Sequence, residues 1–319
     1  MNSEIELDKI VNIINKSKKI GIFTHESPDG DAIGSSLALY LGLKQLKKDV
    51  NVIAEEYSNS FNFLTSLNEI KKKGTGDYDV CISLDCATKQ RLYDLNNSFD
   101  KSNYTISIDH HASNNFYADC NYVEDKSPAT CKTLIKVLKR LNINITKEIG
   151  EALMTGIITD SGGFRYETVD DETFEFAAKM LDLGVNISKI YMQTFDVQTK
   201  AQFKLTSIAT SRLQFFSKNR IAITYITRDD IKKTDAKVGD HEGIVNVGRN
   251  IEGIKVSIFL REDEDGSYKV SFRSNNDVNV AEIAEVFGGG GHTKASGCSV
   301  SMPLSIAIKS LIKETEKVL

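Results

Sequence analysis

Asp109, His110 and His111 form a triplet that closes a short apolar run, residues 104–108. Carboxylate and imidazole are the two commonest ligand types for borderline and hard divalent metals. Two adjacent histidines after a carboxylate are an unusual end for a buried strand unless a cation lies nearby. The triplet alone is compatible with a metal site or with a hydrogen-bonded turn.

Three more clusters of the same chemistry occur in the chain. His25, Asp29 and Asp31 follow the apolar run 19–24, Asp85 follows another such run, and Asp160 lies between hydrophobic residues and two glycines. A single aspartate after a strand is most often a turn residue or a helix N-cap, and a single histidine is most often solvated. Four clusters at expected strand ends or on neighbouring loops are harder to explain as turns.

These residues provide a donor set suited to two divalent metal ions. Four carboxylates and two imidazoles almost balance the charge of two ions, which require several anionic ligands and at least one bridging carboxylate. Oxygen and nitrogen ligands without thiolate favour manganese or magnesium over structural zinc. The candidate ligands are His25, Asp29, Asp31, Asp85, His110 and Asp160.

The elements that must position these residues alternate between strand and helix patterns. Short apolar runs predict strands at 19–24, 51–54, 78–84 and 104–108, and helical spacing predicts helices at 31–47, 129–141, 147–158 and 171–183. This order is typical of an α/β fold with a mostly parallel sheet covered by helices. Ligands of such sheets bind beyond the C-terminal ends of the strands.

Three segments are expected along the chain. Residues 1–186 form the metal-binding catalytic domain, and residues 187–212 lack strand signals and form a helical connector. Residues 213–319 form a smaller α/β domain. Its predicted strands lie at 220–227, 253–261 and 267–273, and its predicted helices lie at 280–287 and 304–318.

Composition narrows the class of partner. The chain has 319 residues, 26% of them charged, and a net charge of −4, whereas proteins that bind long nucleic acids through many phosphates usually carry a basic excess. The five cysteines are scattered without paired spacing, as expected for reduced thiols in a cytoplasmic protein. No signal peptide, membrane span or membrane partner is expected.

The ordered motifs resemble those of the DHH phosphoesterase superfamily. The matching patterns are His-x-x-Pro-Asp-Gly-Asp-Ala-x-Gly-Ser at 25–35, a lone Asp85, Asp-His-His-x-x-Asn at 109–114, and Gly-Ile-x-Thr-Asp-x-Gly-x-Phe-Arg at 156–165. The second block resembles the DHHA1 domain, with Lys-Val-Ser-Phe-Arg-Ser at 269–274 and a four-glycine-His motif within 288–297. The combination is most similar to the stand-alone members that degrade very short RNA and dephosphorylate 3′-phosphoadenosine 5′-phosphate (pAp). One departure is Lys132, which stands where the family usually has Glu.

The resemblance implies a role for each candidate. One Mn²⁺ would be held by His25, Asp29 and Asp85, and a second by Asp85 with the remaining ligands, which are Asp31, His110 and Asp160. Mg²⁺ or Co²⁺ are possible substitutes. His111 would face the scissile phosphate, Asp109 would orient the histidine pair, and a hydroxide held between the metals would be the nucleophile.

The second domain is expected to bind one end of the substrate. Backbone amides in a glycine run can surround a phosphate, although the same run is also compatible with a flexible loop between a helix and a strand. Arginine and histidine side chains would add charge-assisted donors to a terminal phosphate. The candidate residues are Arg249, Arg273, Ser274, Gly290, Gly291 and His292.

The sequence therefore predicts a manganese-dependent phosphoesterase that hydrolyses short RNA oligonucleotides to mononucleotides and pAp to AMP. The alternatives are a soluble phosphodiesterase for cyclic dinucleotides such as c-di-AMP or for linear dinucleotides and, from a different class, a catalytically silent nucleotide-binding protein. The glycine-His motif argues against a family II pyrophosphatase, and a RecJ-type exonuclease would be larger and more basic. Long duplex nucleic acid is not expected as a partner, and a homodimer is possible.

Overall fold

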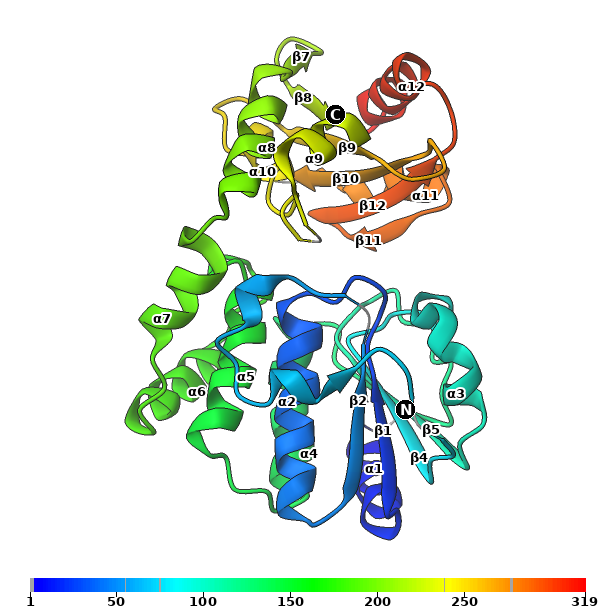
Figure 1. Ribbon diagram of the computed structural model, residues 1–319, viewed down its shortest axis with the longest axis vertical. Helices are drawn as coiled ribbons and strands as arrows, with labels where there is room; N and C mark the ends of the chain where they lie inside the picture. Colours follow the sequence, from blue (N-terminus) through cyan, green and yellow to red (C-terminus); the bar gives the residue numbers. More distant parts are fainter. Residues whose placement is uncertain (1–2, 55, 75, 238, 276–277) are drawn as a thin grey trace. The chain divides into compact units, whose positions relative to one another are not determined.

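The computed structural model describes residues 3–54, 56–74, 76–237, 239–275 and 278–319 (Figure 1). It divides into two compact units, Met1–Val197 and Gln198–Leu319. The division lies within the segment 187–212 that was expected to connect two domains. None of the described helices is long and apolar enough to cross a membrane.

The first unit is built around a six-stranded sheet. Its strands are β1 (Lys19–Phe23), β2 (Asp49–Ile53), β3 (Ile70–Lys71), β4 (Val80–Leu84), β5 (Tyr104–Asp109) and β6 (Cys120–Val123). Their order is β3-β2-β1-β4-β5-β6, and all neighbouring pairs are parallel. The predicted parallel α/β sheet is confirmed.

Helices cover both faces of this sheet, as Figure 1 shows for α2 and α4 on one side and α3 on the other. The helices are α1 (Ser3–Lys16), α2 (Gly30–Gln45), α3 (Asn96–Asp100), α4 (Thr130–Arg140), α5 (Lys147–Asp160), α6 (Asp171–Asp182) and α7 (Ile187–Tyr191). The larger core packs helices such as α2 against the sheet through side chains that include Ile22 and Leu37, both fully buried. A smaller core on the other face contains Phe23 and Phe99.

The strand order places a topological switch point at β1 and β4. The chain leaves β1 for β2 on one side and later returns to β4 on the other. In open parallel sheets, ligands bind in the crevice outside the carboxyl ends of the strands at this point. The loop after β1 carries His25 and Asp29, and Asp85 directly follows β4.

The second unit contains a mixed six-stranded sheet of order β11-β12-β10-β9-β8-β7. Its strands are β7 (Gln214–Phe216), β8 (Ile221–Ile226), β9 (Val256–Glu262), β10 (Tyr268–Ser274), β11 (Gly290–His292) and β12 (Ala295–Val300). Its helices are α8 (Lys200–Ser211), α9 (Arg228–Thr234), α10 (Val245–Arg249), α11 (Val280–Val286) and α12 (Leu304–Glu316). The strands β8 and β9 are parallel, and the other described pairs are antiparallel.

Several strands have no clear sequence signal. β3 has two residues, β11 consists of two glycines and a histidine, and β12 is Ala-Ser-Gly-Cys-Ser-Val, which lacks apolar alternation. Asp160, which follows the predicted helix 147–158 in the sequence, is the last residue of α5. Pairing with stronger neighbours, such as β10 for β12, supplies what the local sequence lacks.

Candidate metal centre

Asp85 lies where β4 turns away from the sheet, between the ends of neighbouring strands. Its backbone φ is 57°, in the left-handed region that aspartate tolerates better than most residues. The Asp85 amide donates to the Ile108 carbonyl at 3.2 Å, and Thr130 Oγ1 donates to Asp85 Oδ1 at 3.1 Å. These contacts hold a nearly buried carboxylate in one orientation at the strand edge.

Three groups of possible metal ligands share this carboxylate, and two of them consist only of predicted ligands. The ligand atoms of His25, Asp29 and Asp85 lie within 4.8 Å of one another, and so do those of Asp31, Asp85 and His110. A carboxylate common to both groups can bridge two cations, because each of its oxygens has two lone pairs.

Hydrogen bonds to the backbone orient both candidate histidine ligands. His25 Nδ1 lies 2.6 Å from the Glu26 carbonyl, and His110 Nδ1 lies 3.0 Å from the Ser127 carbonyl. A carbonyl only accepts, so His110 Nδ1 donates and its Nε2 faces the carboxylates. His25 Nδ1 also lies 3.1 Å from Arg91 Nη2, which is a donor, so the Glu26 carbonyl alone does not set the tautomer of His25. His25 Nε2 lies 3.6 Å from Asp85 Oδ2, and His110 Nε2 lies 3.1 Å from Asp160 Oδ2. Metal-binding histidines usually donate their other ring N–H to a carbonyl or carboxylate, as His110 does.

Asp31 is held at the N-terminus of α4. Its Oδ2 accepts from the Thr130 amide at 2.6 Å, and its Oδ1 accepts from the Cys131 amide at 2.9 Å. Burial, with the charges of Asp85 and Asp160, raises the pKa of Asp31 well above its ordinary range. Buried carboxylates raise one another's pKa, and a divalent cation bound between them would stabilise their ionised forms.

Charges of opposite sign act on His110. Burial alone would lower its pKa, but the nearby carboxylates of Asp160, Asp31 and Asp85 raise it to about 10. The donor set therefore attracts positive charge, whether from a proton or from a metal ion. The residues present fit a divalent metal.

Asp29 and Asp160 complete the predicted ligand set from helix ends. Asp29 is the N-cap of α2, and its Oδ1 accepts from the amides of Asp31 and Ala32 at 3.0 and 3.1 Å. The helix-cap interpretation and the ligand interpretation of Asp29 are thus compatible, because its carboxylate also belongs to the group with His25 and Asp85. Asp160 is 30% exposed, so it lies at the rim of the cluster.

His111 is oriented differently from His110. Its Nδ1 lies 2.7 Å from Asp109 Oδ1, and Asp109 Oδ2 accepts from Asn114 Nδ2 at 2.7 Å. Burial would lower the pKa of His111, but the hydrogen bond to Asp109 raises it above its ordinary value. An imidazole held in this way can carry a proton and present Nε2 to a partner.

Arg91 is a residue near the cluster that the sequence did not single out. Its Nη2 lies 3.1 Å from His25 Nδ1, and its carbonyl accepts from the Glu26 amide at 2.8 Å. Its charge is brought to the cluster by the short helix Lys89–Leu95. An isolated arginine outside any motif gives no sequence signal for this position.

Lys132, the departure from the expected pattern, lies beside this cluster on α4. It forms ion pairs with Asp170, the N-cap of α6, and with Glu172 at 3.4 Å. The lysine therefore connects two helices and takes no place among the possible metal ligands.

In the second unit, strand register places some of the predicted substrate residues together. His292 pairs with Ala295 in β12, and Ala295 pairs with Arg273 in β10. Directly paired residues point to the same face of a sheet, so His292 and Arg273 share a face. Ser257 of β9 pairs with Arg273 and therefore lies on the same face. The Oγ of Ser257 donates to the Val245 carbonyl of α10 at 2.7 Å, so α10 packs on this face, and Arg249 is the last residue of α10.

Ser274 does not join this group. It is the next residue after Arg273 and faces the other side of β10, where its Oγ donates to the Val278 carbonyl at 2.7 Å. The expectation that Ser274 lies beside Arg273 as a donor to substrate is therefore not supported by its position, since adjacent strand residues point to opposite faces.

The last two residues of the glycine run, Gly290 and Gly291, belong to the short strand β11 rather than to an open loop. Gly291 has φ 142°, and a Cβ there would lie 2.6 Å from the Ala295 carbonyl oxygen. A Cβ added at Gly289 would lie still closer to β12, only 2.1 Å from the Gly297 carbonyl oxygen. Gly290 has open space around it, so it is the glycine of this strand whose backbone a ligand can approach.

Comparisons with known proteins define the class. The DHH family N-terminal domain matches residues 19–157, and the DHHA1 domain matches residues 218–319. Together with the cluster, they define an enzyme of the phosphoesterase class with a site for divalent metal. The chain belongs to the DHH family.

Relatives of known name extend over most of the chain. The bifunctional oligoribonuclease and PAP phosphatase NrnA of Thermus thermophilus is 32% identical over 88% of this chain and 84% of its own length. The protein of the same name from Bacillus subtilis is 25% identical, over 92% of each chain. A crystal structure of an exopolyphosphatase-related protein from Bacteroides fragilis covers 98% of this chain and 96% of its own, at TM-score 0.88 and 27% identity.

Proposed function

We propose that this enzyme is a manganese-dependent phosphoesterase that hydrolyses short RNA oligonucleotides to mononucleotides and pAp to AMP. The observation that carries the proposal is that Asp85 belongs to two groups of predicted ligands at once. Relatives named oligoribonuclease and PAP phosphatase, which align over most of the chain, support the choice of substrates.

Each ligand has a place in a two-metal site. His25, Asp29 and Asp85 would hold one ion, and Asp85 would bridge to a second ion held with Asp31, His110 and Asp160. When bound, two such ions would supply a hydroxide at neutral pH and polarise the phosphate. The backbone bonds that orient the two histidines prepare the site for metal before substrate arrives.

His111 would act on the substrate rather than on the metal. Asp109 accepts from Nδ1 of His111 and stabilises its protonated form. Nε2 would then donate to a phosphate oxygen or protonate the leaving oxygen as a general acid. Asp109 itself is a positioning residue, because its oxygens are engaged with His111 and Asn114.

The second domain would bind a terminal phosphate. Arg273 and His292 share one face of its sheet, Gly290 leaves space for a close approach, and Arg249 follows from the helix on that face. A site that holds one end of the substrate favours short oligonucleotides, which agrees with a net charge of −4.

A direct assay tests the proposal. Metal-stripped protein is given Mn²⁺, Mg²⁺ or Co²⁺ and then equal concentrations of pAp, a 5′-phosphorylated RNA dinucleotide, a 20-nucleotide RNA and a cyclic dinucleotide. We expect Mn²⁺-dependent release of AMP from pAp and of mononucleotides from the dinucleotide, with much slower hydrolysis of the long RNA. Faster hydrolysis of the cyclic dinucleotide than of both short substrates would contradict the proposal in favour of the alternative enzyme.

A further inference from the structure

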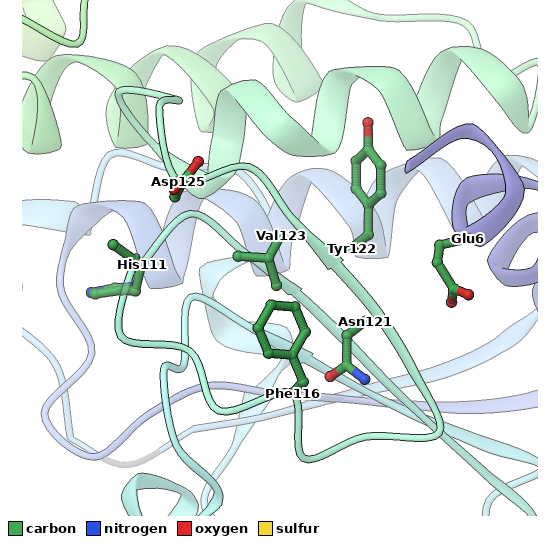
Figure 2. Close-up of a pocket in the computed structure, with 8 residues that line it drawn as sticks. Glu6, His111, Phe116, Asn121, Tyr122, Val123 and Asp125 are labelled. Atoms are coloured by element: carbon green, nitrogen blue, oxygen red, sulfur yellow. The ribbon is translucent and has the colours of Figure 1, made fainter. Parts of the chain in front are cut away.

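A hollow of about 280 Å³ lies in the first unit beside the proposed catalytic histidine. His111 forms part of its wall, and β6 and the loop before it form much of the rest (Figure 2). Ligand pockets have volumes of roughly 300–1,000 Å³, so this hollow has room for one part of a nucleotide but not for a whole dinucleotide. The residues that line it are Glu6, His111, Ala112, Phe116, Asn121, Tyr122, Val123 and Asp125.

Phe116 presents an aromatic side chain to this hollow. Figure 2 shows its ring below Val123, between His111 and Asn121. The residue is 59% exposed, and its φ is 54°, a left-handed conformation that is unfavourable for a bulky side chain. A residue held in such a conformation while its large apolar side chain faces solvent is typical of a functional position.

The hydrogen bonds that hold Phe116 also hold the catalytic histidine. The Phe116 amide donates to Asn114 Oδ1 at 2.8 Å, and Asn114 Nδ2 donates to Asp109 Oδ2 at 2.7 Å. The other Asp109 oxygen accepts from His111. One carboxylate and one amide side chain therefore fix the backbone of Phe116 relative to His111.

The charge of the hollow indicates what can enter it. Asp125 and Glu6 contribute carboxylates, of which Glu6 is paired with Lys9 at 2.7 Å, and His111 contributes an imidazole. The carboxylates offer acceptors to the amino groups of an uncharged aromatic base, and His111 is the basic side chain of this lining. Any of the four bases can stack on an exposed aromatic side chain, because every base has a π-face.

We propose that this hollow is a nucleobase subsite, in which a base next to the scissile phosphate stacks on Phe116. The inference rests on the proposed function, because it assumes that the phosphate facing His111 belongs to a nucleotide. The subsite would make the nucleoside, and not only the phosphates, a determinant of substrate binding.

The test compares substrates with and without a base. The dinucleotide pApA is compared with two analogues, each with an abasic ribose in place of one of the two nucleosides. We expect Phe116→Ala to raise KM for pApA about tenfold, as removal of a stacking aromatic does, and Phe116→Tyr to restore it. With the analogue that lacks the stacked base, Phe116→Ala and wild type should have the same KM.

Two further measurements separate the possible failures. Phe203→Ala, which truncates a phenylalanine that is 65% exposed on α8, is the matched control and should not change KM. Binding of AMP, measured by calorimetry, should be about tenfold weaker in Phe116→Ala, while binding of inorganic phosphate should be unchanged. Equal losses on pApA and both abasic analogues, or unchanged AMP binding, would overturn the subsite. Failure of the wild type to hydrolyse pApA would contradict the proposed function instead, and the AMP measurement would still decide the subsite.

Discussion

His110 and His111 are adjacent in the sequence, but their hydrogen bonds separate them. His110 donates through Nδ1 to a backbone carbonyl and turns Nε2 toward Asp160 and Asp85. His111 directs Nδ1 to the Asp109 carboxylate and lines a hollow. The difference between a carbonyl partner and a carboxylate partner fits one histidine for a metal and the other for a proton.

This separation leads to a prediction for two matched substitutions. His111→Asn should leave the number of bound Mn²⁺ ions unchanged and lower kcat about 10²- to 10⁴-fold, as expected when a general acid is removed. His110→Asn should reduce the bound metal. Metal content by atomic emission and kcat on pAp measure both effects. Loss of metal in His111→Asn with normal content in His110→Asn would reverse the assignment.

At the scale of elements, α2 and α5 bring Asp31 and Asp160 to the same cluster. The two helices approach closely at Gly34, where an added Cβ would lie 2.4 Å from the Ala152 carbonyl oxygen. A backbone atom cannot move aside as a flexible side chain can. The glycine is therefore required by the distance between the helices.

We expect Gly34→Ala to lower the free energy of unfolding by about 1–3 kcal/mol, the usual cost of overpacking a core. Gly42→Ala in the same helix is the matched control, because its Cβ would meet side chains and no backbone atom: Ile143 at 2.9 Å and Leu138 at 3.2 Å. Alanine also favours a helix. Urea unfolding of both variants measures the difference. A Gly34→Ala variant as stable as Gly42→Ala would show that the close approach is not required.

In the second unit, a partly buried ion pair connects the end of α8 to α9. Arg212 Nη2 donates to Asp230 Oδ1 at 2.9 Å, and Asp230 also closes the capping box at Thr227. Burial raises the pKa of Asp230, but the hydrogen bonds from Arg212 and Thr227 together outweigh burial and lower this pKa from 3.8 to about 2. A lowered carboxyl pKa contributes stability above pH 3.8, and this contribution is lost as pH falls from about 4 to 2.

The ionised Asp230 carboxylate should therefore stabilise the protein less as the pH falls. Asp230→Asn should destabilise the protein at pH 7 by about 1–2 kcal/mol, and the difference from wild type should shrink as the pH is lowered from 5 toward 3. Asp229→Asn is the control, because Asp229 pairs with Lys233 at an exposed position of the same helix. Urea unfolding at several pH values measures both variants. A difference that stays constant between pH 7 and pH 3 would contradict the lowered pKa.

The sequence predicted the parallel sheet well, because its long strands are continuous apolar runs. It could not predict β12, whose stability comes from pairing with β10. Among site residues, spacing brought the six candidate ligands to attention, whereas Arg91 and Phe116 were missed. Arg91 has no local motif, and the exposed ring of Phe116 depends on a backbone conformation that composition does not encode.

At the scale of the whole molecule, the two units carry different parts of the proposed chemistry. The first brings together carboxylates and imidazoles at the ends of parallel strands, and the second presents Arg273 and His292 on one sheet face. The weak net charge of −4 agrees with short substrates. The homodimer suggested by the sequence resemblance stays a prediction.

Asp85→Asn tests most directly whether Asp85 bridges two metal ions in a phosphoesterase site. Bound Mn²⁺ per chain and turnover of pAp are measured together for this variant and for wild type. We predict two ions per wild-type chain, fewer in Asp85→Asn, and at least about a 10³-fold loss of turnover. An Asp85→Asn enzyme that binds two ions and keeps its activity would contradict the account.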